Sequence, residues 1–380
     1  MVVFNSHVKY FLKLIIFAVG FYSSHLFSMP CASHAWASVE YLYWWAEDSP
    51  IGIPLITQNN NPAALGSVGE PGTQVIFGAG SNRNSFNFDG LSGARVTLGD
   101  WFDDSHAYGI EGSGFGLAEA SNSFTASSVG GGTINIPFNS TTKGEDALVD
   151  HLPNIVTASD NLTPWGLELN GLFKVSNHYN FPLYFLAGFR YINLSENFAL
   201  SDAIFDNPSL PANAVLNVKD NFSTRNNFYG LQIGSRANFS CQKFIFDITA
   251  LIAAGENYQK LIISGQTDIN NTTIIQPFGL FSEPSNVGSF SNKQFAIVPE
   301  FRAKMAYEAS QTIRPFFTYN VFYINKTIRP ANQIDRNINQ SQNPAFGGSG
   351  ALIGPAVPAV SFHSNSMWMQ GVSAGVEFVF

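Results

Sequence analysis

The last fourteen residues of the chain, Met367 to Phe380, alternate between two kinds of side chain. Since successive side chains of a strand point to opposite sides, this alternation predicts a strand with two unlike faces. One face is apolar and consists of Trp368, Val372, Ala374, Val376, Phe378 and Phe380. The other face holds Gly371, Ser373, Gly375, Glu377 and Val379. A strand of this kind that ends on an aromatic residue is typical of barrels in the bacterial outer membrane, whereas the edge strand of a soluble sandwich is the alternative.

The composition favours the membrane alternative. The chain has 380 residues, of which 45% are hydrophobic and 12% are charged, whereas soluble domains carry about a quarter of charged residues. After the first segment, no apolar run in the sequence is long enough for a membrane-spanning helix. Many apolar residues without an apolar run indicate strands that expose one face to lipid.

The N-terminal segment has the features of a secretory signal. Lys9 and Lys13 precede an apolar run over Leu14–Tyr22, and Ala35-Trp36-Ala37 supplies a small-x-small cleavage pattern. We therefore expect a cleaved signal peptide over residues 1–37 and one barrel domain over residues 38–380, with an uncleaved anchor as the alternative. Removal of the signal leaves one cysteine, Cys241, so that no intramolecular disulfide can form.

The predicted fold is all-β: a transmembrane, antiparallel, up-and-down β-barrel of about ten strands with short periplasmic turns and long extracellular loops. The prediction rests on the strict alternation of short and long connections. The expected strands are Ser38–Ala46, Leu91–Asp100, His106–Leu117, Asn161–Val175, Leu183–Glu196, Asn226–Phe239, Lys243–Gly255, Lys293–Tyr307, Ile313–Ile324 and His363–Phe380. The expected long loops are Glu47–Gly90, which holds a short strand over Thr73–Phe77, and Ala118–Asp160, Asn197–Arg225, Asn257–Asn292 and Asn325–Phe362. For the fourth loop, the alternative is that the preceding strand extends through Leu261–Ser264.

Aromatic residues at the two ends of the chain have distinct expected roles. Tyr41, Tyr43 and Trp45 share one face of the first strand, and barrels place Tyr and Trp where lipid meets water. We expect these three residues at the membrane interface, although in a soluble protein they would belong to the core. At the other end, we expect the outer-membrane assembly machinery to recognise a signal made by Trp368, Val376, Phe378 and Phe380.

Charged residues within the expected strands lie mostly on the face opposite the apolar one. A charge on the lipid face costs about 2–4 kcal/mol near the midplane, which explains the sorting. We expect the lumen to be lined by Arg95, Glu111, Glu168, Lys174, Arg190, Glu196, Arg236, Asp247, Glu300, Arg302, Lys304, Arg314 and Glu377. They form either a selectivity lining for solutes or, as we favour, an ion-pair network that fills a narrow bore. If the second hairpin turns about Asp103, Arg95 faces Glu111 directly.

The sequence offers few motifs for chemistry. Gly78-Ala79-Gly80 lacks the strand–turn–helix context of a nucleotide site and indicates a turn. Barrel-embedded proteases of the omptin kind use acidic residues and a His–Asp pair at the outer rim, but here Asp150-His151 and the nearby Glu145 and Asp146 crowd one loop, which indicates a solvated segment. The seven His residues are scattered, without metal-ligand spacing. We therefore expect no catalytic, cofactor or metal site, and a protein that is not an enzyme.

Five stretches, taken in this order, resemble a known bacterial family. They are Val39–Trp45 (VEYLYWW), Gly72–Gly78 (GTQVIFG), Ser92–Trp101 (SGARVTLGDW), Leu186–Tyr191 (LAGFRY) and Asn227–Gly234 (NFYGLQIG). Together they resemble putative beta-barrel porin family seven, a group of predicted outer-membrane barrels. The resemblance covers nearly the whole mature chain and implies an outer-membrane location and a barrel. It implies no activity and no catalytic residues.

Two main functions remain open at this stage, beside an enzyme at the outer rim, which the crowded loop residues disfavour. The first is a small porin-like channel with a charge-lined lumen for passive passage of solutes, which the family name favours. The second is a plugged structural or surface-interaction barrel that acts through its long loops, which the narrow bore of a small barrel favours. We expect a monomer whose partners are outer-membrane lipid and lipopolysaccharide, the barrel-assembly machinery, and small solutes or surface ligands. The net charge of −8 and the absence of Lys/Arg runs argue against a nucleic-acid partner.

Overall fold

The computed structural model describes residues 34–128, 132–148, 153–178, 181–344 and 347–380. Of the predicted signal segment, residues 1–37, all but the last four residues lie outside the described ranges. Strands dominate the described chain, which confirms the prediction of an all-β fold. No helix in these ranges is both long and apolar enough to cross a membrane.

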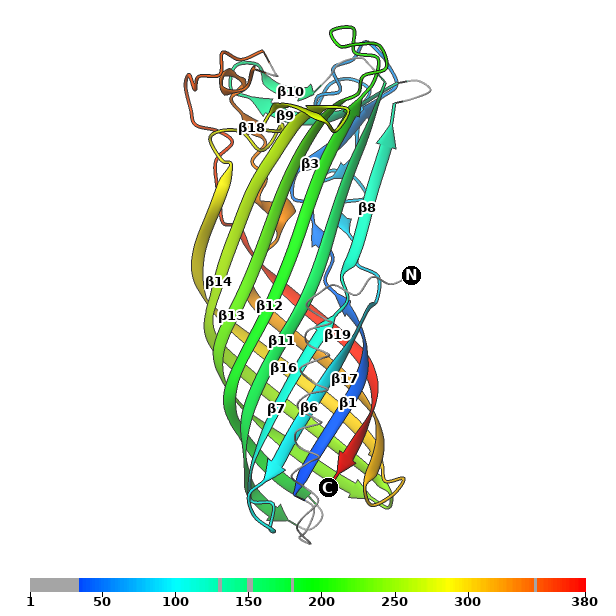
Figure 1. The fold of residues 1–380 in the computed structure, drawn as a ribbon, viewed down its shortest axis with the longest axis vertical. Helices are drawn as coiled ribbons and strands as arrows, with labels where there is room; N and C mark the ends of the chain where they lie inside the picture. The colour runs from blue at the N-terminus through cyan, green and yellow to red at the C-terminus, as the bar shows by residue number, and fades with distance from the viewer. Residues whose placement is uncertain (1–33, 129–131, 149–152, 179–180, 345–346) are drawn as a thin grey trace.

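The central feature is a ring of long antiparallel strands (Figure 1). Hydrogen-bonded pairs run in the order β11-β12-β13-β14-β16-β17-β19-β1-β6-β7 and return from β7 to β11. The ring strands are β1 (Ala35–Ala46), β6 (Leu91–Trp101), β7 (Tyr108–Leu117), β11 (Asn154–His178), β12 (Phe181–Ile204), β13 (Leu216–Cys241), β14 (Phe244–Ile269), β16 (Gly288–Tyr307), β17 (Ile313–Ile328) and β19 (Ser364–Val379). The first and last strands pair directly, with Ala37 opposite Phe378.

Short connections gather at one end of the ring, which we call the turn end. They comprise residues 102–107, 242–243 and 308–312, and the C-terminus lies at the same end (Figure 1). At the opposite end, which we call the cap end, the strands run farther than the sequence predicted. The predicted loops Asn197–Arg225 and Asn257–Asn292 contain large parts of β12, β13 and β14. Outward Ser, Thr and Asn side chains made these segments resemble loops, but their inward side chains include buried apolar residues that pack against the cap described below, such as Phe198, Leu200, Val218 and Phe222.

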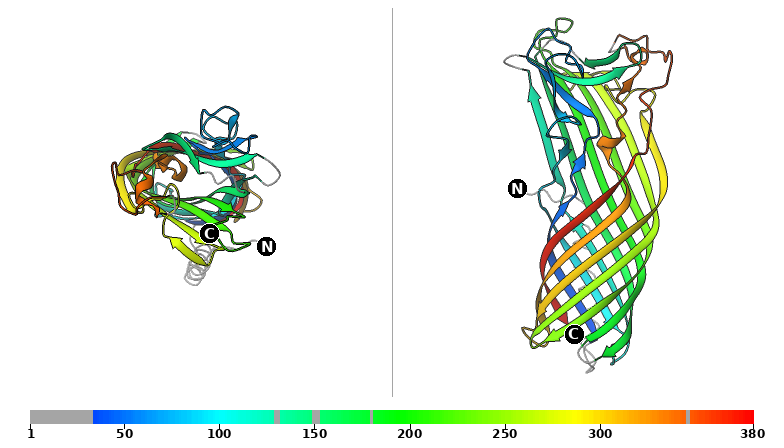
Figure 2. Two further views of the ribbon diagram at one scale, coloured as in Figure 1. Left: turned by 90° about the horizontal axis from the view of Figure 1, so that it is seen from above. Right: turned by 180° about the vertical axis from the view of Figure 1, so that it is seen from behind.

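Only part of the ring continues to the cap end (Figure 2). β17 pairs with β16 only through Glu300–Ala306, and β8 (Ala120–Ser127) adds to the side of β11 above β7. The upper portions of β11, β12, β13, β14 and β16, together with β8, form a curved sheet with two free lateral edges, which we call the extension. The predicted loop Ala118–Asp160 is therefore largely strand.

The inner side of the extension is filled by shorter elements, which we call the cap. Its strands are β2 (Ser49–Pro50), β3 (Pro54–Asn59), β4 (Thr73–Gly78), β5 (Ser85–Phe86), β9 (Thr133–Ser140), β10 (Gly144–Leu148) and β18 (Asn337–Ile338), and its short 3-10 helices are η2 (Pro330–Gln333) and η3 (Gln340–Gln342). The predicted strand Thr73–Phe77 is confirmed as β4. A further strand, β15 (Thr273–Gln276), pairs with the end of β14. Apolar cap and wall residues share one core, which includes Leu55, Ile56, Phe86, Phe138, Phe198, Phe222 and Phe281.

The outer face of the ring carries two rows of aromatic residues with an apolar band between them. Trp165, Tyr191 and Tyr229 on adjacent strands lie 5.0 and 4.9 Å apart between ring centroids. Phe173 lies eight positions farther along β11, beside Phe185 at 6.4 Å. The separation matches the 9–11 residues with which a tilted strand crosses a bilayer.

The hairpin between β6 and β7 differs from its prediction. Arg95 lies opposite Phe115, and Glu111 lies opposite Gly99, so the prediction that Arg95 faces Glu111 is wrong. The reason is the turn, in which the Asp103 carboxylate accepts the backbone N–H groups of Ala107 and Tyr108. These hydrogen bonds make the connection between β6 and β7 longer and move its centre toward Ser105.

Candidate functional site

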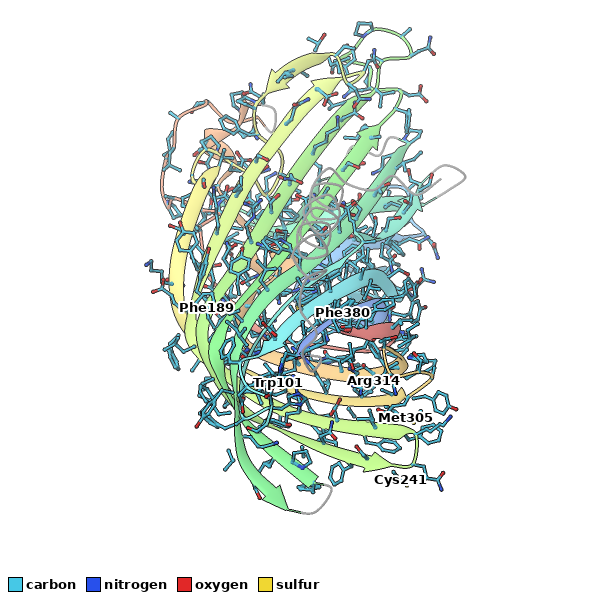
Figure 3. The ribbon with its side chains drawn as sticks, turned by 60° about the horizontal axis from the view of Figure 1, so that its bottom comes forward. Trp101, Phe189, Cys241, Met305, Arg314 and Phe380 are labelled. Atoms are coloured by element: carbon cyan, nitrogen blue, oxygen red, sulfur yellow. The ribbon has the colours of Figure 1, made fainter. Side chains whose placement is uncertain are left out.

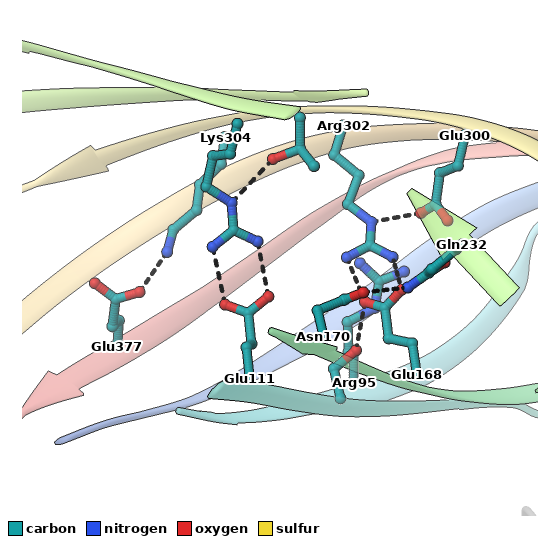
Figure 4. Close-up of polar contacts among 12 residues, drawn as sticks. Arg95, Glu111, Glu168, Asn170, Gln232, Glu300, Arg302, Lys304 and Glu377 are labelled. Atoms are coloured by element: carbon teal, nitrogen blue, oxygen red, sulfur yellow. Dashed lines mark hydrogen bonds and ion pairs between the residues drawn. The ribbon is translucent and has the colours of Figure 1, made fainter. Parts of the chain in front are cut away.

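The interior of the ring at the turn end holds an ion-pair network that braces strands across the bore (Figure 4). Arg302 on β16 makes a bidentate pair with Glu168 on β11, at 2.6 and 2.8 Å. Arg236 on β13 makes a second bidentate pair with Glu111 on β7, at 2.7 and 3.0 Å. Neither pair joins neighbouring strands, so both guanidinium groups reach across the interior. The buried carboxylates are thereby neutralised and hydrogen-bonded.

Further contacts lie beside these two pairs, and we call all of them together the network. Glu300 contacts both Arg190 and Arg302 and also accepts from the amide of Asn320. Arg95 pairs with Glu40 at 3.5 Å between Nη1 and Oε1. The predictions omitted Glu40, although its position between Val39 and Tyr41, which are both exposed, placed it on the inner face.

The remaining predicted lumen residues divide by position. Lys304 and Arg314 both contact Glu377 near the turn end, and Asp247 accepts from Asn238 at 2.6 Å. Lys174 is outside the network, because it precedes a β-bulge and donates to the backbone oxygen of Ser105 at 2.7 Å. Glu196 lies near the cap instead, and its contacts are described below.

A cavity of about 420 Å³ opens into this network from the turn end, and we call it the vestibule. Charged side chains on its walls include Glu111, Arg236, Asp247, Lys304, Arg314 and Glu377. Aromatic residues at its rim pack against one another: Trp101 lies 5.3 Å from both Trp36 and Tyr184 between ring centroids. The vestibule is therefore polar, and its charges of opposite sign face each other in pairs.

An apolar layer separates the network from the cap. Trp44 on β1, Phe115 on β7 and Phe322 on β17 contact one another, with ring centroids 5.3, 5.9 and 6.4 Å apart. Because β7 and β17 are not neighbours in the ring, the contact between Phe115 and Phe322 crosses the interior. Every ring strand contributes buried apolar side chains to the layer, among them Leu42, Leu91, Leu117, Leu162, Ile192, Phe228, Ala253, Val298, Ile324 and Met367.

The network is fixed to the apolar layer by cation–π contacts. The guanidinium carbon of Arg95 lies 5.3 Å from the ring centroid of Trp44 and 5.8 Å from that of Phe115. That of Arg190 lies 5.6 Å from the centroid of Phe322. Each arginine thus uses its edge for a carboxylate and its face for an aromatic ring. The two layers hold each other in one arrangement.

Buried acidic residues on the extension hold the cap in place. Glu196 on β12 accepts from Ser49 at 2.6 Å and from Arg329, whose Nη2 lies 2.9 Å from Oε1. Ser49 belongs to the connection after β1 and Arg329 to the connection after β17, so one carboxylate binds two loops. Asp220 on β13 accepts the backbone N–H groups of residues 280–282, at distances of 2.8 to 3.2 Å.

Other predicted positions lie on the outside of the ring. Tyr41, Tyr43 and Trp45 are exposed on β1, and Phe378 and Phe380 are exposed at the end of the chain. Trp368 and Val376 are half-buried on β19, and Cys241 is exposed at the end of β13.

The structure offers little for the rejected chemical motifs. Asp150 and His151 fall outside the described residues, whereas Glu145 pairs with Arg336 at 2.8 Å and Asp146 with Lys143 at 3.5 Å. Within the described ranges, no group of three or more His, Cys, Asp or Glu side chains could hold a metal ion.

A ring of antiparallel strands with an apolar outer band and a charged, ion-paired interior defines an outer-membrane β-barrel of the porin and transport type. The chain belongs to the family described as Putative beta barrel porin-7 (BBP7), whose model matches residues 36–380. This match confirms the resemblance found in the sequence. No curated protein matches the chain.

Three similar solved structures have little sequence identity to this chain. The outer membrane protease OmpT from Escherichia coli has a TM-score of 0.48 and 9% identity, over 92% of this chain and 99% of its own. A Pseudomonas aeruginosa FadL homologue has a TM-score of 0.26 and 6% identity, over 91% and 89%. The CymD monoaromatic hydrocarbon channel has a TM-score of 0.20 and 7% identity, over 92% and 89%.

One prediction from the sequence is contradicted by these comparisons. We expected a protein that is not an enzyme, but the OmpT structure, which matches 92% of the chain, is that of a protease. The prediction is therefore withdrawn. At 9% identity the match assigns neither an activity nor its absence.

Proposed function

We propose that this protein is a plugged outer-membrane barrel that acts at the cell surface through its extension and cap. The observation that carries the proposal is the apolar layer across the bore. Trp44, Phe115 and Phe322 meet in the middle of the interior, and Trp44 and Phe322 are at most 1% exposed. A polar solute that entered from the vestibule would have to displace these rings and lose its hydration.

The cap supports the same proposal from the other side. Its apolar residues form one core with the inner face of the extension, and Glu196 and Asp220 bind it through buried hydrogen bonds. A loop that were to open for each passing solute would break these contacts each time. The cap instead presents a fixed surface beyond the membrane, which suits binding to a surface ligand.

We further propose the position of the barrel in its membrane. A barrel of ten strands would place the turn end in the periplasm and the extension outside the cell, after removal of a signal peptide ending at Ala37. Outer-membrane lipid and lipopolysaccharide would surround the apolar band of a monomer. The assembly machinery would recognise the last strand through Trp368, Val376, Phe378 and Phe380.

Conductance of the purified chain in a planar bilayer tests whether the bore is closed. We expect a silent bilayer from wild-type protein whose folding is shown by a heat-dependent shift on a denaturing gel. A variant with Trp44→Ala, Phe115→Ala and Phe322→Ala removes the rings that meet in the centre and should show current steps. Steps from the wild type would rule out the plugged barrel.

The second candidate function is a narrow channel, and the vestibule favours it. A polar cavity of about 420 Å³ already leads from the turn end to the apolar layer. If this candidate is correct, the wild type conducts in discrete steps. The step size or ion preference then changes in Arg190→Ala, because Arg190 lies where the network meets Phe322.

A further inference from the structure

A groove of about 330 Å³ lies on the outer wall of the ring near the turn end, across β14, β16, β17 and β19. Its outward-facing lining is apolar and consists of Phe246, Ile248, Met305, Phe317, Tyr319 and Val372. Figure 3 shows Met305 on the outside of this end, on the same side as Cys241. The groove is separate from the interior network and lies on the wall that we place against lipid.

A single small residue makes the hollow. Ala303 lies opposite Ile248 on one side and Tyr319 on the other. The next row toward the turn end is Phe246, Met305 and Phe317, and Phe317 is 63% exposed. The large side chains stand out from the wall around the methyl group of Ala303, so the hollow lies over this residue.

A cation lies at the turn-end side of the groove. Lys243 is exposed in the turn before β14, and its Nζ lies 6.0 Å from the ring centroid of Tyr307. The neighbouring carboxylate of Glu308 pairs with Arg314 at 3.1 Å. Among the described residues, no carboxylate lies within ion-pair distance of Lys243, so its ammonium group is available to an anion.

We propose that this groove is a binding site for one anionic glycerophospholipid of the periplasmic leaflet. An acyl chain lies over Ala303 between the large side chains, and the phosphate lies near Lys243. The order of groups along the wall, apolar groove, then aromatic ring, then cation, matches the order of acyl chain, glycerol and phosphate in the lipid. The proposal rests on the membrane position given above and not on whether the bore is closed.

The shape of the groove favours a lipid over a second copy of this chain. A stable protein interface buries about 1,200 Å² or more in total, which requires a broad, matching surface. Phe317 protrudes from the wall beside the hollow over Ala303. A flat barrel wall would rest on Phe317 and leave the hollow empty.

Native mass spectrometry of the full chain, released from detergent with added phosphatidylglycerol or phosphatidylcholine, tests the proposal. We expect one phosphatidylglycerol to remain bound to the wild type. Ala303→Phe fills the hollow and should weaken this binding about tenfold, because the loss of contact with two methylene groups alone has an effect of this size. The control is Ala250→Phe, the same change at an outward-facing position of the neighbouring strand β14 that is outside the groove lining, and it should bind like the wild type.

Lys243→Gln tests the headgroup separately and lies in an exposed turn, where it leaves the strands intact. The preference for phosphatidylglycerol over phosphatidylcholine should fall about fivefold, the effect of one lysine at an anionic surface. Unchanged lipid binding in both Ala303→Phe and Lys243→Gln overturns the proposal. Loss of a dimer in Ala303→Phe overturns it as well, in favour of a second copy. A missing heat shift in wild-type protein would instead refute the barrel itself.

Discussion

At the scale of single residues, the interior depends on charges that are buried in pairs. Glu168 receives two bonds from Arg302 and a third from Ser113 at 2.8 Å. Glu168→Gln keeps the size of the side chain but removes the carboxylate that binds both Nη atoms of Arg302, which then retains only its contact with Glu300. Removing one partner of a buried pair costs about 3–5 kcal/mol, so we expect a loss of this size in the free energy of unfolding, measured with guanidinium in lipid vesicles.

The matched control is the exposed pair of Glu256 and Lys293, at 3.0 Å on the outer face of the extension. Glu256→Gln should change the free energy of unfolding by less than about 1 kcal/mol, because solvated pairs contribute little. Equal effects of the two substitutions would show that the interior pair is hydrated and that the network is loosely packed.

Glu283 gives the cap a dependence on pH. Burial raises the pKa of Glu283 to about 8, with the nearby Asp220 adding to the effect, while the amide of Asn343 donates to its carboxylate. The unfolded chain loses this proton near pH 4.5, whereas the folded chain keeps it until about pH 8. Folding stability therefore falls as pH rises between these values and levels off above them.

Glu283→Gln should remove that dependence. We expect the variant and the wild type to have similar stability at pH 5 and the variant to be more stable by a few kcal/mol at pH 8, at about 1.4 kcal/mol per pKa unit. Guanidinium unfolding at both pH values measures the difference. Parallel pH profiles for the two proteins would contradict the assignment to Glu283.

At the scale of elements, the start of β1 matters for the ring. β1 begins at Ala35, and Trp36 packs 5.3 Å from Trp101 between ring centroids. Phe380 donates its backbone N–H to the oxygen of Ala35 at 2.8 Å. A chain that begins at Ser38 lacks these contacts between the two ends of the sequence.

We therefore expect a refolded chain that starts at Ser38 to unfold at a lower temperature than one that starts at His34, and to show faster hydrogen exchange at the end of β19. Mass spectrometry of the natural protein then shows which of the two the cell makes. Identical melting of both chains would mean that residues 34–37 add nothing to the ring.

The sequence predicted elements well where one face had to meet lipid. Along β11, the alternation that places Leu167, Leu169 and Phe173 on the outer face is strong, because the hydrocarbon of a membrane tolerates only apolar side chains on that face. It failed toward the cap end, where the outward residues of β12 and β13 include Asn197, Ser201, Asn221 and Ser223. There the apolar signal lies only in buried residues such as Phe198 and Phe222. The register between Arg95 and Glu111 was predicted wrongly, because a turn of this length that is held by hydrogen bonds to Asp103 has no clear pattern in the local sequence.

The apolar layer was the main part of the site that the sequence did not reveal. Trp44, Phe115 and Phe322 come from strands far apart in the chain. Their meeting depends on the diameter and stagger of the ring, which local alternation does not determine. The charged residues were easier to assign, because the cost of a charge in lipid is a property of each residue alone.

At the scale of the whole molecule, the ring of pairings predicts resistance to denaturation. Strands that bond on both sides have no free edge within the membrane band. Unheated protein in dodecyl sulfate should migrate faster than boiled protein, and the Trp44, Phe115 and Phe322 triple alanine variant should shift at a lower temperature. Identical migration before and after boiling would argue against a ring that is bonded all the way round.

The extension continues only part of the ring, so the two sides of the molecule differ. The long strands from β11 to β16 extend beyond the rest of the ring on one side only, and the cap rests against their inner face (Figure 2). A partner that diffuses in the membrane plane therefore contacts the polar outer face of the extension from one side of the barrel. From the opposite side it contacts the folded loops of the cap. Encounters with neighbouring proteins in a crowded membrane therefore depend on the rotational orientation of the barrel about its axis. A barrel that rotates freely exposes its binding surface to any one neighbour for only part of each rotation.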